Sequence, residues 1–398
     1  MSEAAKAARK MIDGPRAGLS VPYDAAGVVV VDLRALAHNW QSLREKVAPA
    51  ECAAVVKADC YRLGARAGVP ALFAAGAKTL FVATVQEARQ VRGLAPEATI
   101  YVLDGLLPGT VEDLLEVGAL PVLSSLPEIT EWGQAAPSRK EPVACAIHVD
   151  SGLNRLGLSA REIQELAHNM HLLDRLDVKL VMSHLACADE PENPKNAQQL
   201  EVFQSLQPLL PSVPLSLAAS DGLMLGPDFH FDLVRPGYAL YGGQTHPNRN
   251  CPVKPVVEVY SRVLQIRDLA PGQSVGYSAT FVADRVTRLA VVAAGYADGA
   301  PRHMSAGSGE KHGWVAFGGR LAPIVGRVSM DLITVDITDL EDVEINRGDW
   351  VEFVGPTISL EDAGASAGTI GYEILTRLSP RFARVYVGAE DAAGAVED

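Results

Sequence analysis

Ala53-Ala54-Val55-Val56-Lys57-Ala58-Asp59-Cys60-Tyr61 is the stretch that decides the fold. Its first four residues are small and apolar, which predicts a strand buried on both faces. Lys57 follows this strand directly. An ammonium group there is unfavourable unless it reaches water, pairs or becomes neutral, and a lysine with a lowered pKa is the usual amine for a Schiff base. Lys57 is therefore a candidate catalytic residue; the alternative is a plain lysine whose head group reaches solvent.

Apolar, strand-like runs recur along the chain after this one. Helix-like segments separate them, among them Gln86–Arg92, Val111–Val117, Ala160–Asn169 and Ala197–Leu209. Eight such units over about 200 residues predict a closed (β/α)8 TIM-type barrel within an α/β protein. An open doubly wound sheet is the alternative, but the dinucleotide motif GxGxxG is absent after the first strand. The predicted barrel strands are 53–57, 79–83, 99–103, 121–123, 144–149, 178–183, 213–218 and 232–235.

The pattern changes after about Pro255. Strand-like runs with Gly and Pro turns then dominate, which predicts a separate, mainly antiparallel β domain with one short helix at Thr369–Leu378. The predicted division is a flexible tail over 1–27, a lead-in strand and helix plus the barrel over 28–255, and the β domain over 256–398. The strand at 28–31 precedes the barrel strands, so it is also a candidate to pair with the β domain.

Composition excludes several classes of protein. The chain has 398 residues and a net charge of −13, which argues against nucleic acid as the main partner. No apolar run reaches the ~18 residues of a membrane span, and Met1 to Arg16 lack the apolar core of a secretory signal. The 5 cysteines form no CxxC pair and no zinc pattern, which is typical of reduced thiols in a cytoplasmic protein without a metal site.

Polar residues gather where the predicted barrel strands end. They are Lys57, the segment Asp150–Arg155, His184, Ser220 and Arg235, while the strand bodies stay apolar. In a (β/α)8 barrel the active site lies at the carboxyl ends of the strands. This pattern predicts an active site formed by these residues.

Lys57 also lies in a longer motif, Val56-Lys57-Ala58-Asp59-Cys60-Tyr61-Arg62-Leu63-Gly64-Ala65, which resembles the cofactor-lysine motif of alanine racemases. Seven more motifs resemble that family, in family order along the chain. They are Asp150-Ser151-Gly152-Leu153-Asn154-Arg155-Leu156-Gly157, Ser183-His184-Leu185-Ala186, Arg235-Pro236-Gly237-Tyr238-Ala239-Leu240-Tyr241-Gly242, Val275-Gly276-Tyr277-Ser278-Ala279-Thr280-Phe281, Gly295-Tyr296-Ala297-Asp298-Gly299, Gly326-Arg327-Val328-Ser329-Met330-Asp331 and Thr369-Ile370-Gly371-Tyr372-Glu373.

The resemblance implies a racemase that interconverts L-alanine and D-alanine with pyridoxal 5′-phosphate attached to Lys57. It implies D-alanine supply for peptidoglycan, and a head-to-tail homodimer with composite active sites. Lys57 and Tyr277 would serve as the two bases, one for each face of the substrate. Arg235 would face the pyridine nitrogen, and His184 would lie beside the ring, linked to Arg235 and Tyr277.

The remaining site residues also follow from the resemblance. Arg155 would contact the phenolic oxygen of the cofactor and the substrate carboxylate, and Met330 would offer its backbone N–H to that carboxylate. The phosphate would be held by Tyr61, Ser220, Gly237, Tyr238 and Tyr372. The entrance would be lined by Asp189, Tyr296, Arg302 and Arg327.

One departure from the family pattern concerns the partner of Arg155. Many members carry a carbamylated lysine seven residues before this arginine, where this chain has His148. Three alternatives to an alanine racemase share parts of the pattern: a racemase of broader specificity for serine or basic amino acids, a barrel-type amino-acid decarboxylase, and a pyridoxal phosphate carrier protein. Arg235 argues against the decarboxylase, because relatives of that class carry a carboxylate there. The β domain with Tyr277 argues against the carrier.

Overall fold

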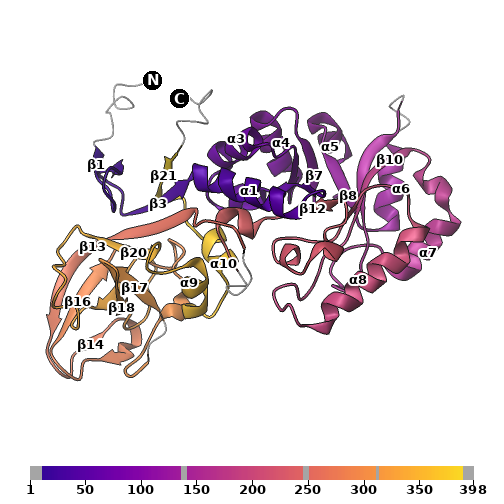
Figure 1. Cartoon of the computed structure of the whole chain (residues 1–398). Coiled ribbons are helices and arrows are strands. Elements are labelled where there is room, and N and C mark those ends of the chain that lie inside the picture. Colours follow the sequence, from indigo (N-terminus) through magenta and orange to yellow (C-terminus); the bar gives the residue numbers. More distant parts are fainter. Residues whose placement is uncertain (1–10, 136–140, 245–250, 311–312, 389–398) are drawn as a thin grey trace. The chain divides into compact units, whose positions relative to one another are not determined.

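The computed structural model describes residues 11–135, 141–244, 251–310 and 313–388 (Figure 1). The chain divides into two compact units. The barrel unit is Arg34–Lys254, and the β unit combines the chain up to Leu33 with Pro255–Ala389. Among the helices of these described ranges, none is both long enough and apolar enough to cross a membrane.

The main sheet of the barrel unit has 7 parallel strands in the order β11-β10-β9-β8-β7-β6-β5. A further strand, β12 (Leu233–Val234), pairs in parallel with β4 (Glu51–Cys52), which lies directly before β5. Beyond the other end of the sheet, the Arg235 N–H donates to the Ala218 carbonyl at 2.9 Å, next to β11. β12 thereby joins the two edges, and the predicted (β/α)8 barrel is confirmed. The sheet strands are β5 (Ala54–Val55), β6 (Thr79–Val82), β7 (Thr99–Val102), β8 (Leu120–Leu123), β9 (Val143–His148), β10 (Leu176–Met182) and β11 (Leu215–Ser216).

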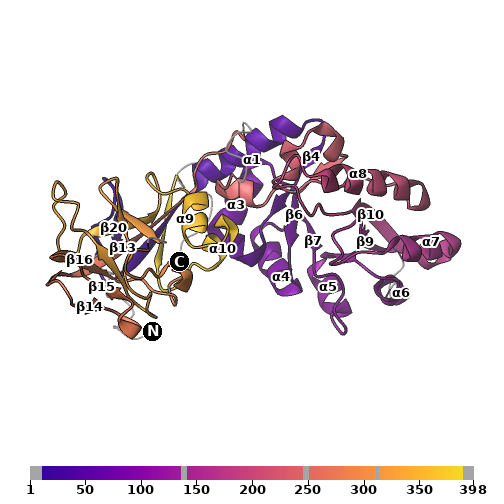
Figure 2. The same cartoon turned by 90° about the horizontal axis from the view of Figure 1, so that it is seen from below.

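The helices of the barrel unit lie outside its strands (Figure 2). Thr84 and Ser159 begin α4 and α7 with capping boxes, in which a glutamate three residues later reaches back to the cap. Asn193 caps α8 by accepting from the Lys195 N–H at 3.0 Å, so this helix begins at Pro194 rather than at the predicted Ala197. The helices are α1 (Leu33–Val47), α3 (Ala65–Ala75), α4 (Val85–Leu94), α5 (Val111–Val117), α6 (Leu126–Gln134), α7 (Ala160–His168) and α8 (Pro194–Leu206).

The β unit is built on one long strand, β13 (Val257–Leu269). Its first half pairs antiparallel with β3 and β20, and its second half with β16. Two short helices lie between β20 and β21 in the sequence, α9 (Leu360–Ser366) and α10 (Gly371–Thr376), of which the sequence predicted only the second. The mainly antiparallel second domain is thus confirmed. Its other strands are β3 (Gly27–Asp32), β14 (Ser274–Val275), β15 (Phe281–Val282), β16 (Thr287–Val292), β17 (Trp314–Phe317), β18 (Arg320–Pro323), β19 (Ile333–Asp336), β20 (Trp350–Val354) and β21 (Ala383–Val387).

The strand β3 belongs to the β unit, although it precedes the barrel in the sequence. It pairs antiparallel with β13 and in parallel with β21, and Val28 to Val31 are all buried. The expected pairing of 28–31 with the β domain is therefore confirmed. The first domain boundary consequently lies after Leu33, and not before residue 28 as the predicted division had it.

The prediction of a flexible tail over 1–27 is wrong for residues 11–27, while residues 1–10 lie outside the described residues. β1 (Met11–Asp13) and β2 (Ser20–Pro22) form an antiparallel pair. Leu19 and Val21 are buried in a cluster with Val28, Val30 and Tyr260. Burial of these two apolar side chains against β3 holds the segment to the sheet.

Replacing Leu19 with alanine should therefore destabilise the β unit. Leu19 is 7% exposed, and truncating a buried leucine costs about 2–5 kcal/mol. Urea denaturation followed by circular dichroism should show a lower free energy of unfolding by about this amount. Leu321→Ala is the control, because Leu321 is 50% exposed in the same unit and its truncation should change the free energy by about 0.5 kcal/mol or less. Equal effects of the two substitutions would contradict the packing of this segment.

Candidate active site

Lys57 follows β5 at the carboxyl end of the barrel. Burial lowers the pKa of its amine, and the positive charge of Arg155 lowers it further. The carboxylates of Glu87 and Asp104 act in the opposite direction. The Lys57 amine is therefore more easily neutral than a lysine in water.

The backbone after Lys57 has an unusual conformation. Within α2 (Lys57–Tyr61) and its C-cap, five consecutive residues from Ala58 to Arg62 have φ values of 53, 57, 51, 54 and 67°. The Arg62 N–H donates to the Ala58 carbonyl at 2.7 Å, so this segment is a left-handed helical turn. A left-handed conformation costs a non-glycine residue about 1–2 kcal/mol. Surrounding contacts must therefore hold this turn in place.

Two carboxylates hold the ends of this left-handed turn. Glu87 Oε1 accepts from the Ala58 N–H at 2.7 Å. Asp59 Oδ1 accepts from the Ala65 N–H at 2.7 Å, where α3 begins. Both are hydrogen bonds to ionisable acceptors, which are stronger than those between neutral groups.

Ser220, Gly237 and Tyr61 meet at the ends of the first and last barrel strands. The Ser220 hydroxyl accepts from the N–H groups of Gly237 at 3.0 Å and Ala239 at 3.1 Å. A Cβ atom on Gly237 would collide with the Tyr61 hydroxyl, so glycine is required for this close approach. Tyr238, the next residue, is fully buried. The structure thus brings three of the five predicted phosphate ligands together, Tyr61, Ser220 and Gly237, whereas the ring of Tyr238 packs against Gly243.

Arg235 lies at the end of β12 with a fully buried guanidinium. Its terminal nitrogens donate to the Ser216 hydroxyl and to the Ser183 carbonyl, the latter at 2.6 Å. One of them also lies 3.5 Å from His184 Nδ1. Burial lowers the pKa of Arg235 to about 9, so it still carries its charge near neutral pH. Among the described residues, the hydrogen bonds of the Arg235 guanidinium start from its terminal nitrogens, which leaves its Nε–H for a ligand.

Two histidines lie close to Arg235 and Arg155. His184 follows β10, and burial together with Arg235 lowers its pKa to about 3. His148 ends β9, and burial together with Arg235 and Arg155 lowers its pKa to about 4. Both imidazoles are therefore neutral near pH 7. His148 consequently offers Arg155 no charged partner.

Arg155 is exposed in the loop that follows β9. Asp150 shapes this loop by accepting from the N–H groups of Gly152 at 2.9 Å and Asn154 at 3.1 Å. The charge of Arg155 acts on Lys57, His148 and His184. The mouth of the barrel thus collects basic groups, an arrangement that suits a ligand with anionic groups.

The other predicted site residues lie in the β unit, except for Asp189, which is exposed in the barrel unit. Tyr277 is 69% exposed between β14 and β15, and Met330 is 54% exposed. Arg302 and Arg327 line an open pocket of about 230 Å³ together with His303 and Ser305. Tyr372 lies in α10, and Tyr296 is 38% exposed.

A hydrogen-bonded pair of turns positions Tyr296 beside Met330. The Tyr296 N–H donates to the Ser329 carbonyl and the Ala297 N–H to the Met330 carbonyl, both at 3.0 Å. Asp298 accepts from the Gly295 N–H at 2.9 Å and forms an ion pair with Arg381 at 3.2 Å.

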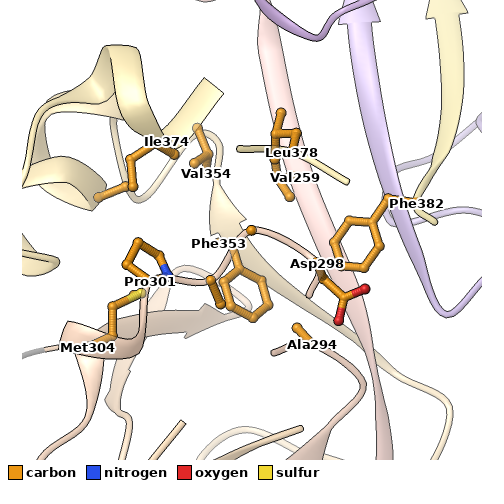
Figure 3. A pocket seen from close by; sticks show the side chains of 13 residues that line it. Val259, Ala294, Asp298, Pro301, Met304, Phe353, Val354, Ile374, Leu378 and Phe382 are labelled. Carbon is orange, nitrogen blue, oxygen red and sulfur yellow. The ribbon is translucent and has the colours of Figure 1, made fainter. Parts of the chain in front are cut away.

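Figure 3 shows Asp298 beside Phe382 at a mostly apolar cavity of about 40 Å³. A cavity of this size has room for ordered water only, so we assign it to packing and not to substrate binding.

Sequence reasoning missed Glu87 and Asp298. The spacing Thr84-x-x-Glu87 is a capping-box signature and predicts the helix start, but not the contact with Ala58. Asp298 lies within the motif Gly295-Tyr296-Ala297-Asp298-Gly299. The motif does not predict its hydrogen bond from the Gly295 N–H or its ion pair with Arg381, which is distant in the sequence.

Replacing His148 with glutamine should make the free energy of unfolding fall less steeply as the pH is lowered. Below its ordinary pKa of about 6.5 the unfolded imidazole takes up a proton, whereas the folded one does so only near 4. The unfolded state then binds more protons, so the free energy of unfolding falls as pH falls through this window, by up to about 1.4 kcal/mol per pH unit. Urea denaturation at about pH 6.5 and about pH 5 should show a smaller fall for His148→Gln than for the wild type.

The control is His171→Gln, since His171 is exposed. It should keep the acid dependence of the wild type. Identical slopes for His148→Gln and wild-type protein would contradict a buried neutral imidazole at this position.

Two family models match the chain in succession. The N-terminal domain of alanine racemase matches residues 31–245, and the C-terminal domain of alanine racemase matches residues 256–386. The alanine racemase of Brucella ovis is 43% identical over 377 residues, which cover 91% of this chain and 94% of that protein. The alanine racemase of Rhizobium meliloti is 43% identical over 370 residues, covering 92% of this chain and 97% of that protein.

Solved structures agree with these matches. The alanine racemase of Bartonella henselae, a crystal structure with covalently bound pyridoxal phosphate, has 40% sequence identity and a TM-score of 0.87. The comparison covers 91% of this chain and 100% of that one. The alanine racemase of Streptomyces lavendulae has 28% identity and a TM-score of 0.85, covering 92% and 98%. Since two family models and relatives of this identity cover nearly the whole chain, it belongs to the alanine racemase family.

Proposed function

We propose that this enzyme interconverts L-alanine and D-alanine by a two-base mechanism, with pyridoxal 5′-phosphate attached to Lys57. The observation that carries the proposal is the partly buried Lys57 amine of lowered pKa at the carboxyl end of the barrel, with Arg155 and His184 close enough to interact with it and Arg235 beside His184. When bound, pyridoxal phosphate withdraws electrons from the α-carbon of an amino acid, so that its proton can be removed near neutral pH.

The residues present fit this cofactor. Lys57 supplies an amine for its aldehyde carbon. The Ser220 oxygen accepts from the N–H groups of Gly237 and Ala239, so its own O–H remains to donate to a phosphate, in a place where a Cβ on Gly237 would block the approach of the backbone. We assign Tyr61 and Tyr238 to the same phosphate group, with Tyr372 as a further ligand.

Arg235 is assigned to the pyridine nitrogen. The contacts of its terminal nitrogens leave the Nε–H of Arg235 as the available donor. A guanidinium donates hydrogen bonds but does not accept them. Arg235 therefore leaves that nitrogen without a proton. His184 is neutral and supports the orientation of this guanidinium. A carboxylate at this place would protonate the nitrogen instead, so Arg235 favours a racemase over a decarboxylase.

Lys57 and Tyr277 are assigned as the two proton-transfer groups. Lys57 takes the α-proton of D-alanine, and Tyr277 takes that of L-alanine from the opposite face. Arg155 holds the substrate carboxylate together with the Met330 backbone N–H. The Arg155 guanidinium would also bind the phenolic oxygen of the cofactor.

We assign the entrance to Asp189, Tyr296, Arg302 and Arg327. The two arginines share a pocket whose charge favours an anionic carboxylate.

We further propose a head-to-tail homodimer in which a second copy completes each site. Lys57 belongs to the barrel unit, whereas Tyr277 and Met330 belong to the β unit, where both are more than half exposed. Exposed aromatic and thioether side chains are typical of surfaces that contact a partner. The D-alanine product would serve peptidoglycan synthesis; an Agrobacterium fabrum relative, 43% identical over 371 residues, is named a biosynthetic alanine racemase.

Tyr277→Phe tests the assigned reaction. The variant keeps the aromatic ring but loses the group that carries the proton, so racemisation should fall in both directions by about 10²–10⁴-fold. Lys57 should still exchange the α-hydrogen of D-alanine with solvent. In deuterium oxide the variant should therefore label D-alanine much faster than L-alanine, as measured by mass spectrometry of the separated enantiomers.

Tyr23→Phe is the matched control, since Tyr23 is 57% exposed in the same unit and has no assigned role. It should racemise alanine at the wild-type rate. Equal labelling of both enantiomers by Tyr277→Phe would mean that one base serves both faces, and the two-base mechanism would be refuted.

A further inference from the structure

Glu87 is a partly buried carboxylate whose contacts go beyond capping a helix. It is the third residue of α4, and Thr84 Oγ1 accepts from its N–H at 3.2 Å. Glu87 Oε2 accepts from the N–H groups of Ala83 at 2.7 Å and Thr84 at 3.3 Å. These three hydrogen bonds satisfy the start of the helix.

The second oxygen of this carboxylate has a different partner. Glu87 Oε1 accepts from the Ala58 N–H at 2.7 Å, across 29 positions of the sequence. Ala58 comes directly after Lys57 and is the first of the five left-handed residues. Glu87 thus connects the start of α4 with the start of the strained turn.

We propose that Glu87 is a positioning residue for Lys57, because its hydrogen bond to the Ala58 N–H fixes the left-handed turn from which the Lys57 side chain extends. The hydrogen bond is independent of the reaction, whereas its effect on catalysis rests on the proposed role of Lys57. Without this acceptor, a partly buried N–H would lose its partner and the turn could relax toward right-handed conformations, which cost less.

The charge of Glu87 supports the same role. Four charged or titratable groups interact with the Lys57 amine: Arg155 lowers its pKa, Glu87 and Asp104 raise it, and Lys57 in turn lowers the pKa of His184. Glu87 therefore fixes the backbone next to Lys57, and its negative charge partly offsets the effect of Arg155 on the pKa of Lys57. A substitution that removes the hydrogen bond to Ala58 but keeps the negative charge separates the effect on the backbone from the effect on the pKa of Lys57.

Glu87→Asp makes this separation. The aspartate keeps the charge and can close a capping box, as Asp362 does with Ser359 at the start of α9. Its side chain is one methylene shorter and should withdraw from Ala58. In Glu87→Gln the length is kept, but only the single amide oxygen can accept, so the side chain serves either the Ala58 or the Ala83 N–H, and a bond to Ala58 would lack the charged acceptor that strengthens it in the wild type.

The matched control is Glu128→Asp. Glu128 occupies the same position in α6, where it accepts from the Ser124 N–H at 2.8 Å and faces the Ser125 cap. Within the described residues, Glu128 forms hydrogen bonds with Ser124, Ser125 and the Leu106 backbone, none of which belongs to the turn after Lys57. Both substitutions should therefore have similar effects on helix capping and on thermal stability.

Hydrogen exchange of the full-length holoenzyme tests the proposal. In Glu87→Asp and Glu87→Gln, the amides of residues 58–62 should exchange on the order of tenfold faster than in wild type, the effect of losing one hydrogen bond to a charged acceptor. The kcat for alanine should fall by a similar factor or more, with little change in KM. Glu128→Asp should change neither the exchange of this segment nor kcat.

Two results would overturn the proposal. Unchanged exchange of residues 58–62 in both Glu87 variants would show that the turn does not depend on this carboxylate. A loss of kcat as large in Glu128→Asp as in Glu87→Asp would reduce the role of Glu87 to helix capping. Hydrogen exchange is measured without substrate. A wild-type enzyme that is inactive toward alanine would therefore refute the proposed function, but not the role of the hydrogen bond between Glu87 and the Ala58 N–H.

Discussion

The carboxyl end of the first barrel strand holds a lysine amine largely away from water, and the rest of the site depends on that constraint. Burial is the main cause of the lowered pKa of Lys57, and Arg155 adds to it. The backbone beside this amine is five residues of left-handed turn, each costing about 1–2 kcal/mol. The buried strands and carboxylates around it offset that cost, so the barrel core supports a conformation that the local sequence disfavours.

The architecture could be predicted largely from the spacing of apolar residues. The alternation of strand-like and helix-like runs from 53 to 235 predicted the barrel, because a strand that is buried on both faces has a nearly continuous apolar sequence. The tail prediction failed since Leu19 and Val21 are isolated apolar residues, and their burial depends on β3, which contacts them only in the folded β unit. The helix α9 was missed although Ser359 and Asp362 have capping-box spacing.

The site was predictable to the extent that its residues stand at strand ends. Lys57, His184, Ser220 and Arg235 were predicted in this way, and the structure brings the donors of Arg235 to His184 and that of Gly237 to Ser220. The left-handed turn could not be predicted, because Ala58, Asp59, Cys60 and Tyr61 include no glycine. The contact of Glu87 with Ala58 joins the segments that follow β5 and β6. A local sequence pattern cannot predict it, because the two residues are 29 positions apart.

The central claim is that Lys57 holds the cofactor. The most direct test is to reduce the purified full-length enzyme with borohydride and to locate the added pyridoxyl mass by peptide mass spectrometry. This mass should lie on the peptide containing Lys57 and should be lost in Lys57→Ala. Pyridoxyl mass on a different lysine, or an unmodified Lys57 in an active enzyme, would contradict this claim.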